Sequence, residues 1–241
     1  MLAKDHSFTR YDEELEDIRN RVLQMGGLVE QQIGDAIRAL VEGDFQQMEQ
    51  VDRNDRRVNA HEVGIDGTCA LIIARRQPTA VDLRMLMGIS KIVTDLERCG
   101  DKAALIARKA MLIFANQSMV HIPCIVGIGE IGEVAAGMLR TALNCFARQD
   151  AVAAAAIVRD DLEIDHRFEA ITRQLITFMM EDPRLISMAF EVLFIAKALE
   201  RIGDHAKNIA EQIIFITRGT DVRHIAVEQL EQEAKGTGED A

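Results

Sequence analysis

The chain has 241 residues, of which 48% are hydrophobic but only 4% aromatic, and its formal net charge is −11. This acidic balance argues against nucleic-acid binding, which needs a basic surface, and against electrostatic adsorption to anionic lipid. The four cysteines form no C-x-x-C pair, which excludes zinc-ribbon and thioredoxin-like classes. Because the sequence shows neither a signal-peptide core nor an apolar run of about 18 residues, we expect a cytoplasmic protein without membrane insertion.

Helical periodicity runs through the first half of the chain, where apolar residues recur every three or four positions. These stripes predict three helices that end near residues 43, 76 and 115. Asp44 is the candidate N-cap of the second helix, because Gln47 follows three residues later as in a capping box. Thr79 is the candidate N-cap of the third helix.

The second half predicts three more helices, which begin near Pro123, Asp150 and Asp182. Asp182 is followed by Pro183, a combination typical of an N-cap and the first helical residue. The sixth helix is expected to end at Gly219, in the position where glycine commonly closes a helix. Beyond it, residues 219–241 are polar and acidic, and we expect a disordered or weakly helical tail.

The two halves of the chain repeat each other. Met25–Asp44 aligns with Ile131–Asp150 at an offset of 106 residues, and Leu96–Ala107 aligns with Leu199–Ala210 at an offset of 103, with 8 identities in 12 positions. A period of this length indicates a duplicated module rather than a solenoid. We therefore predict an all-α protein of six helices in two tandem three-helix bundles, related by pseudo-two-fold symmetry. The units are residues 1–120 and 121–218, followed by the tail at 219–241.

The repeated motif contains an acid pair that disfavours a helix on its own. Glu97 and Asp101, and likewise Glu200 and Asp204, place two like charges on successive turns of one helix face. The glycine before each aspartate costs about 1 kcal/mol relative to alanine. A solvated acidic stripe would explain one such pair, but two copies that keep their glycines favour a site for cations. Paired carboxylates are hard oxygen ligands that suit Mg²⁺, Ca²⁺, Mn²⁺ or iron.

Further acidic residues lie on the second helix of each repeat. Asp161 and Asp165 are four residues apart, and their repeat counterparts are Asp55 and Asn59. If each second helix packs beside its third, these side chains complete a cluster around each motif. A solvated helix face is an equally good interpretation of these four residues.

A carboxylate-bridged di-metal enzyme, an oxidase or hydrolase, is the alternative function. Glu163 and His166 supply one Glu-x-x-His sequence, but a di-iron centre of the ferritin-like type needs two. The repeat counterpart runs from Arg57 to Ala60 and lacks both ligands. A helical scaffold without metal is a third possibility.

The chain resembles the PhoU family of phosphate-signalling regulators. The resemblance lies in "RRQPTAVDLR" (Arg75–Arg84), "DLERCGDKA" (Asp95–Ala103) and "ALERIGDHAKNIAE" (Ala198–Glu211), in the same order and duplication. It implies two three-helix bundles that bind metal, with Mg, Mn, Fe or Zn as the candidates, at Glu97, Asp101, Glu200 and Asp204.

The resemblance also implies a role and partners. Family members are non-enzymatic negative regulators of the phosphate response in bacterial cytoplasm. They are thought to link the phosphate ABC transporter, through its ATPase subunit, to the PhoR-type histidine kinase, commonly as homodimers.

Overall fold

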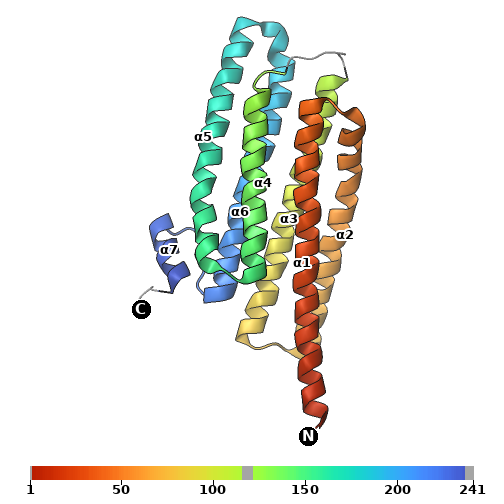
Figure 1. Cartoon of the computed structure of the whole chain (residues 1–241), viewed down its shortest axis with the longest axis vertical. Helices are drawn as coiled ribbons and strands as arrows, with labels where there is room; N and C mark the ends of the chain where they lie inside the picture. The colour runs from red at the N-terminus through yellow and green to blue at the C-terminus, as the bar shows by residue number, and fades with distance from the viewer. Residues whose placement is uncertain (1, 116–121, 237–241) are drawn as a thin grey trace.

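The structure, a computed structural model, describes residues 2–115 and 122–236, and this part of the chain consists of helices and short connections (Figure 1). Six long helices account for most of it, as predicted, and a seventh, short helix follows them. In chain order the elements are α1 (Leu2–Glu42), α2 (Phe45–Arg76), α3 (Ala80–Phe114), α4 (Ile125–Arg148), α5 (Ala151–Glu181), the 3₁₀ turn η1 (Pro183–Leu185), α6 (Ile186–Arg218) and α7 (Val227–Lys235).

Equivalent caps begin the second helix of each repeat. The Asp44 side chain accepts a hydrogen bond of 3.0 Å from the Gln47 backbone N–H, and the Asp150 side chain accepts one of 2.9 Å from that of Ala153. Each bond satisfies one of the donors that a helix start leaves unpaired. At the end of α6, Gly219 has a φ of 89°, the left-handed conformation that favours glycine. The caps at Asp44 and Asp150 and the helix end at Gly219 are therefore confirmed.

Two predicted helix starts differ in detail. Thr79 occupies the N-cap position of α3, but its side chain makes no capping hydrogen bond. Asp182 caps the 3₁₀ turn through the Arg184 backbone N–H, and α6 itself begins only at Ile186. The proline at 183 fits the tight turn because its fixed φ suits a first helical position.

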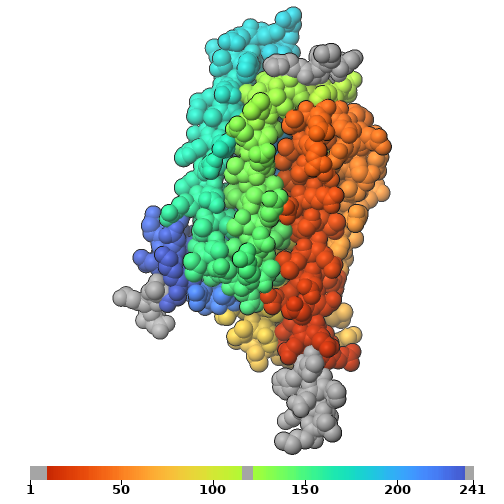
Figure 2. Space-filling model, viewed as in Figure 1, coloured from red at the N-terminus to blue at the C-terminus, as the bar shows by residue number. Residues whose placement is uncertain are grey.

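The six long helices form two three-helix bundles, α1–α3 and α4–α6, which pack side by side along their length (Figure 1). The bundles meet along two lines of contact, between α3 and α6 and between α1 and α4. Figure 2 shows α1 and α4 adjacent on one face of the molecule. Buried side chains of both bundles join into one hydrophobic core. The predicted unit boundary between residues 120 and 121 lies outside the described residues.

Reciprocal sockets at the α1–α4 contact show the two-fold relation between the bundles. A Cβ on Gly26 would lie 2.3 Å from Cδ2 of Leu143, and a Cβ on Gly132 would lie 2.4 Å from Cδ1 of Ile37. Gly26 and Gly132 are repeat counterparts at an offset of 106 residues, as are Ile37 and Leu143. Each half therefore inserts the same side chain into a glycine socket of the other half.

Residues 219–236, expected as a disordered or weakly helical tail, are ordered and include the short helix α7. The segment folds back on the second bundle, and α7 packs mainly on α5 (Figure 1). Val222, Leu230 and Ala234 are buried there, and the Arg218 side chain donates a hydrogen bond of 2.9 Å to the Ala234 carbonyl. Burial of these few apolar side chains holds a segment whose overall composition is polar. Residues 237–241 lie outside the described residues.

None of the described helices is long and apolar enough to cross a membrane.

Candidate metal centre

The repeated acid pairs lie on the two central helices of the molecule. Glu97 and Asp101 are on α3, and Glu200 and Asp204 are on α6. All four side chains are at most half-exposed, and Glu200 is buried.

Gly100 and Gly203 bring the second helix of each bundle close to these pairs. A Cβ on Gly100 would lie 3.5 Å from Oδ1 of Asp55 on α2, and a Cβ on Gly203 would lie 3.5 Å from Oδ1 of Asp161 on α5. Both oxygens lie at ordinary contact distance, so the aspartates of the neighbouring helices pack directly beside the motif glycines. Asp55 and Asp161, predicted as weaker candidates, are brought to the motifs.

The other two weaker candidates lie one turn further along the same helices. Asn59 Nδ2 donates a hydrogen bond of 3.4 Å to Asp55 Oδ2. Burial raises the pKa of Asp161, Lys207 opposes this rise, and the charges of Asp204 and Asp165 add to it. Asn59 thus contacts its cluster directly, whereas Asp165 acts on its cluster through charge.

The first cluster, around Gly100, carries negative charge that few basic groups oppose. Burial raises the pKa of Glu97, and the charges of Asp101, Glu62 and Asp55 raise it further. Burial and then the charge of Asp101 raise the pKa of Asp55. Arg98 lies 3.7 Å from Glu97 Oε2, and the charge of Arg108 lowers the pKa of Asp55 only in part against these effects. Among the described residues, no basic side chain lies within 4 Å of the carboxylate of Asp55 or Asp101.

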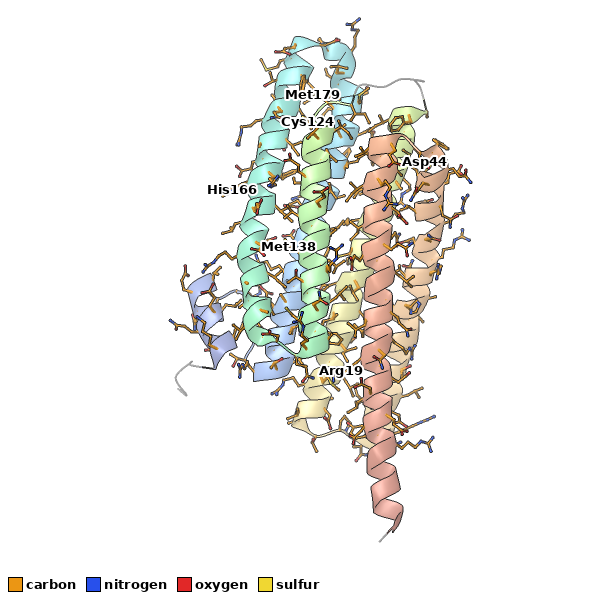
Figure 3. All side chains as sticks on the ribbon, in the orientation of Figure 1. Arg19, Asp44, Cys124, Met138, His166 and Met179 are labelled. Atoms are coloured by element: carbon orange, nitrogen blue, oxygen red, sulfur yellow. The ribbon has the colours of Figure 1, made fainter. Side chains whose placement is uncertain are left out.

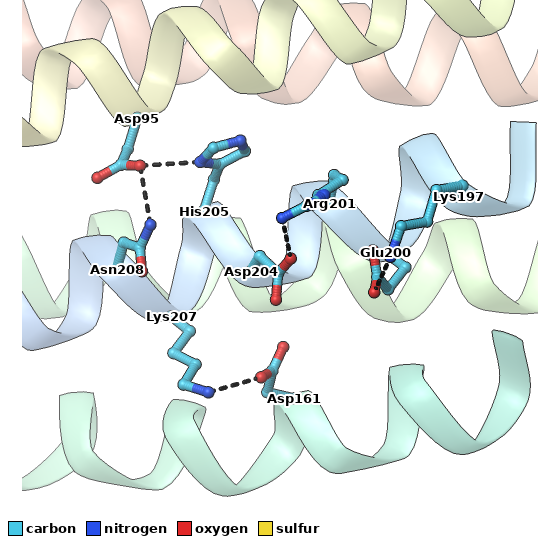
Figure 4. A network of polar contacts seen from close by, with 9 residues as sticks. All are labelled: Asp95, Asp161, Lys197, Glu200, Arg201, Asp204, His205, Lys207 and Asn208. Carbon is cyan, nitrogen blue, oxygen red and sulfur yellow. Dashed lines mark hydrogen bonds and ion pairs between the residues drawn. The ribbon is translucent and has the colours of Figure 1, made fainter. Parts of the chain in front are cut away.

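The second cluster, around Gly203, is instead paired internally (Figure 4). Three of its carboxylates each form an ion pair with a basic side chain of the same protein. The pairs are Lys207 with Asp161 at 3.0 Å, Arg201 with Asp204 at 3.2 Å, and Lys197 with Glu200. Charge in this half of the molecule is therefore largely neutralised by the chain itself.

His205 faces away from the second cluster and contacts α3. Its Nδ1 lies 2.8 Å from Asp95 Oδ1, and Asn208 Nδ2 donates to the same oxygen at 3.1 Å (Figure 4). This network joins α6 to α3 and gives the histidine a structural partner.

Metal ligands are not preassembled in either cluster: within residues 10–115 and 122–236, no three His, Cys, Asp or Glu side chains are arranged to hold an ion. Buried acceptor oxygens without a donor nevertheless occur in both clusters. They are Gln32 Oε1, Asp55 Oδ1 and Asn59 Oδ1 in the first, and Glu200 Oε2 in the second. A buried acceptor with no donor carries a desolvation cost of about 1–3 kcal/mol, which a bound cation would remove. The oxygen-rich donor set therefore fits a hard metal ion.

Three residues of these clusters escaped the sequence-based prediction: Gln32, Lys197 and Lys207. The repeat comparison contains the signal, because each differs from its counterpart in the other half. At an offset of 106 residues Gln32 corresponds to Met138 (labelled in Figure 3), and at an offset of 103 Lys207 corresponds to Ala104. Differences between aligned halves mark the places where the two sites diverge.

The Glu-x-x-His sequence lies on the outer surface of α5. Glu163 and His166 are both exposed, and His166 projects from the side of the helix (Figure 3). Glu163 Oε1 accepts hydrogen bonds of 3.0 and 2.7 Å from Arg167. The pair is therefore far from a buried di-metal arrangement.

The fold and the site define a class of protein, a duplicated three-helix bundle with one Glu-x-x-x-Asp pair on the last helix of each unit. A family model described as "PhoU domain" matches residues 22–110 and 128–213, one match in each bundle. The chain belongs to the PhoU family.

Similar proteins extend this match over nearly the whole chain. A "Phosphate-specific transport system accessory protein PhoU homolog" of a Burkholderia species is 47% identical over 97% of this chain and 99% of its own length. The "Phosphate-specific transport system accessory protein PhoU" of Escherichia coli is 43% identical over 98% of this chain and 96% of its own.

Two solved structures have the same fold. The crystal structure of PhoU from Pseudomonas aeruginosa matches with a TM-score of 0.83 at 43% identity, over 87% of this chain and all of that one. The phosphate transport system regulatory protein PhoU from Streptococcus pneumoniae matches with a TM-score of 0.80 at 29% identity, over 88% of this chain and 99% of that one.

Proposed function

We propose that this chain is a cytoplasmic, non-enzymatic regulator of phosphate uptake and signalling. It links a phosphate ABC transporter, through the ATPase subunit, to a PhoR-type histidine kinase, and it represses the phosphate regulon when phosphate is plentiful. The observation that carries this proposal is full-length similarity to proteins named as accessory proteins of the phosphate-specific transport system.

Metal binding at the two acid clusters is part of the proposal. Glu97 and Asp101 with Asp55 and Asn59 would hold an ion in the first bundle, and Glu200 and Asp204 with Asp161 and Asp165 in the second. The metal, Mg, Mn, Fe or Zn, would neutralise carboxylates that otherwise repel one another between adjacent helices. Support comes from the unpaired buried oxygens and from the raised pKa values of Asp55 and Glu97.

Partner contacts are proposed on exposed apolar side chains. Ile186, Phe190 and Phe194 lie four residues apart on α6, so they share one helix face, and each is about half-exposed. Lys109 from α3 lies 4.6 Å from the centre of the Phe194 ring, which extends this face across both bundles. Apolar patches of this kind suit contacts with other proteins, including a second copy of this chain. Light scattering tests the proposed homodimer: a mass near twice 26.9 kDa supports it, and a monomer contradicts it.

Deletion of the gene in its native host, with a phosphate-responsive reporter, tests the regulatory role. We expect the reporter to become active even in high phosphate, and repression to return when the wild-type protein is supplied. The double variant Glu97→Gln with Asp101→Asn should restore less repression than the wild type if metal binding contributes. Glu169→Gln is the matched control, because Glu169 is an exposed acid on α5 outside both clusters. A reporter that stays repressed in the deletion strain would contradict the proposed function.

A further inference from the structure

The two acid clusters are built on equivalent helices but differ in the side chains that face their carboxylates. In the second cluster, Lys207 and Lys197 supply positive charge. The equivalent positions in the first cluster are Ala104 and Thr94, which supply none. The duplicated halves have therefore diverged at the positions that decide whether the carboxylates need an external counter-ion.

Gln32 is the distinctive residue of the first cluster. Its side chain is buried, with 4% exposure, and it reaches the cluster from α1, so a third helix contributes to this site. Its Nε2 donates to the carbonyl oxygens of Val51 and Gly100, each at 3.4 Å. Burial and the charge of Asp101 raise the pKa of Asp55, and a hydrogen bond from the Gln32 side chain opposes this rise, so the two side chains are neighbours. Oε1 of Gln32 has no donor.

Oε1 of Gln32 and Oδ1 of Asp55 both lie beside Gly100. They lie 3.6 and 3.5 Å from the position that a Cβ would occupy on Gly100. Asp55 Oδ1 is also buried without a donor. Two neighbouring buried acceptor oxygens without donors are costly, and a bound cation would remove this cost. The carboxylates of Glu97 and Asp101 add negative charge at the same location.

The second cluster has no amide oxygen and its aspartate is paired, so Glu200 Oε2 is its one buried acceptor without a donor among the described residues. The counterpart of Gln32 is Met138, which offers no oxygen. Oδ1 of Asp161 lies at the same 3.5 Å from the Cβ position of Gly203, but Oδ2 of the same carboxylate accepts a hydrogen bond from Lys207. The ammonium group of Lys207 therefore neutralises Asp161, whereas the counterpart position in the first cluster, Ala104, provides no basic group for Asp55.

We propose that the two clusters are not equivalent. The first binds an external hard divalent cation, Mg²⁺ or Mn²⁺, with Gln32 Oε1 and Asp55 Oδ1 among its ligands. In the second, Lys207 and Lys197 neutralise the carboxylates in place of an external cation. This inference rests on the proposed metal binding and narrows it to one cluster and one class of metal. An amide oxygen and carboxylates favour hard cations, and the first cluster offers neither thiolate nor imidazole. The lysines act as a built-in substitute for metal in the second bundle.

Titration of the chelator-treated full-length protein with Mn²⁺ tests the proposal, with free Mn²⁺ followed by its electron paramagnetic resonance signal. Gln32→Met gives the first cluster the residue found in the second, at similar volume, and should weaken Mn²⁺ binding about tenfold or more. Gln212→Met is the matched control, because Gln212 is also buried with an unpaired Oε1 but lies on α6.

Removal of the two lysines from the second cluster is the complementary experiment. The double variant Lys197→Met with Lys207→Met should bind more Mn²⁺ per chain than the wild type, since it leaves the carboxylates of Glu200 and Asp161 without their partners. A direct readout that needs no variant is NMR: Mn²⁺ at a small fraction of one equivalent should broaden the side-chain amide signal of Gln32 before that of Gln212.

The outcomes separate the inference from the proposed metal binding. Wild-type binding that Gln32→Met leaves unchanged, or amide signals of Gln32 and Gln212 that broaden together, would overturn the non-equivalence and leave metal binding intact. An unchanged Mn²⁺ stoichiometry in the lysine double variant would also overturn it. Absence of Mn²⁺ binding by the wild-type protein would overturn both.

Discussion

Lys207 on α6 donates a hydrogen bond of 3.0 Å to Asp161 on α5, and Asp161 is only 4% exposed (Figure 4). Although burial alone lowers the pKa of Lys207, the hydrogen bond and the charge of Asp161 raise it overall. This ion pair joins two helices of the second bundle and has no counterpart in the first. Its removal should therefore affect the stability of the second bundle in a pH-dependent way.

Lys207→Met should lower the free energy of unfolding by about 1–3 kcal/mol at pH 7, because Asp161 then remains buried without its partner. Since the pKa of Asp161 is raised by burial, the loss should shrink as the pH falls and the carboxyl takes up a proton. Urea unfolding at several pH values measures this. Arg173→Met removes an exposed ion pair on α5 and should change stability by no more than about 0.5 kcal/mol. A loss that does not depend on pH would contradict the prediction.

Asp55→Asn should slightly stabilise the metal-free protein at pH 7, by about 1 kcal/mol or less. The pKa of Asp55 is raised by burial and by Asp101, so its ionised form opposes folding. A carboxyl whose pKa is higher in the folded state stabilises the fold below its unfolded pKa and loses that contribution as the pH rises through the folded value. The advantage of the variant should therefore vanish near pH 4, where the unfolded carboxyl also holds its proton.

Adding Mn²⁺ should reverse this order, because the ion would stabilise the wild type but not Asp55→Asn. Urea unfolding with and without Mn²⁺, at pH 7 and near pH 4, measures both effects. A variant that is less stable than the wild type in the absence of metal would contradict the prediction, since the hydrogen bonds to Asp55 would then outweigh its burial and its repulsion from Asp101.

Gly26→Ala and Gly132→Ala should each lower the free energy of unfolding by about 1–3 kcal/mol, because the added methyl groups would meet Leu143 and Ile37 in the sockets between α1 and α4. Gly27→Ala is the neighbouring control. A Cβ there has no atom within 4 Å, so the gain in helix propensity should stabilise the protein by up to about 1 kcal/mol. Thermal melting of the three variants distinguishes socket packing from helix propensity, and a stabilised Gly26→Ala would contradict the socket.

Leu230→Ala should release α7 from the second bundle while the six long helices stay folded. Leu230 is 1% exposed, and a helix of nine residues is too short to persist in water without packing. Limited proteolysis should cut the variant within residues 220–236 faster than the wild type. Gln229→Ala changes the exposed neighbour of Leu230 and should be cut at the wild-type rate. Equal cleavage of the two variants would mean that Leu230 does not hold the segment.

Much of the fold follows from local patterns. The six long helices could be predicted because their apolar stripes repeat over many turns, and the caps at Asp44 and Asp150 because a side-chain acceptor three residues before a backbone N–H is a local feature. The packing of α7 was not predicted, since its nine residues show little apolar content and depend on the surface of α5. Composition alone does not reveal that a distant helix provides this surface.

The candidate site likewise contains residues that the sequence predicts and one residue that it does not. The i, i+4 spacing and the repeat predict Glu97, Asp101, Glu200 and Asp204 as candidate ligands without a structure. Gln32 could not be identified from its surroundings in the sequence, because its role depends on the backbone of α3 and on Asp55 from α2. Contacts among three helices set the chemistry of this residue, and the sequence alone does not contain them.

The reciprocal sockets of Gly26 and Gly132 bear on how the chain arose. Each socket is filled from the other repeat, so a single three-helix unit would leave both its glycine and its inserted side chain without a partner. Two such units would satisfy each other by the contacts of an isologous dimer, in which the same patch serves both subunits. The molecule thus has the form of an ancient symmetric dimer fused into one polypeptide. Its halves are constrained to evolve together, with position 26 matched to 143 and position 132 matched to 37.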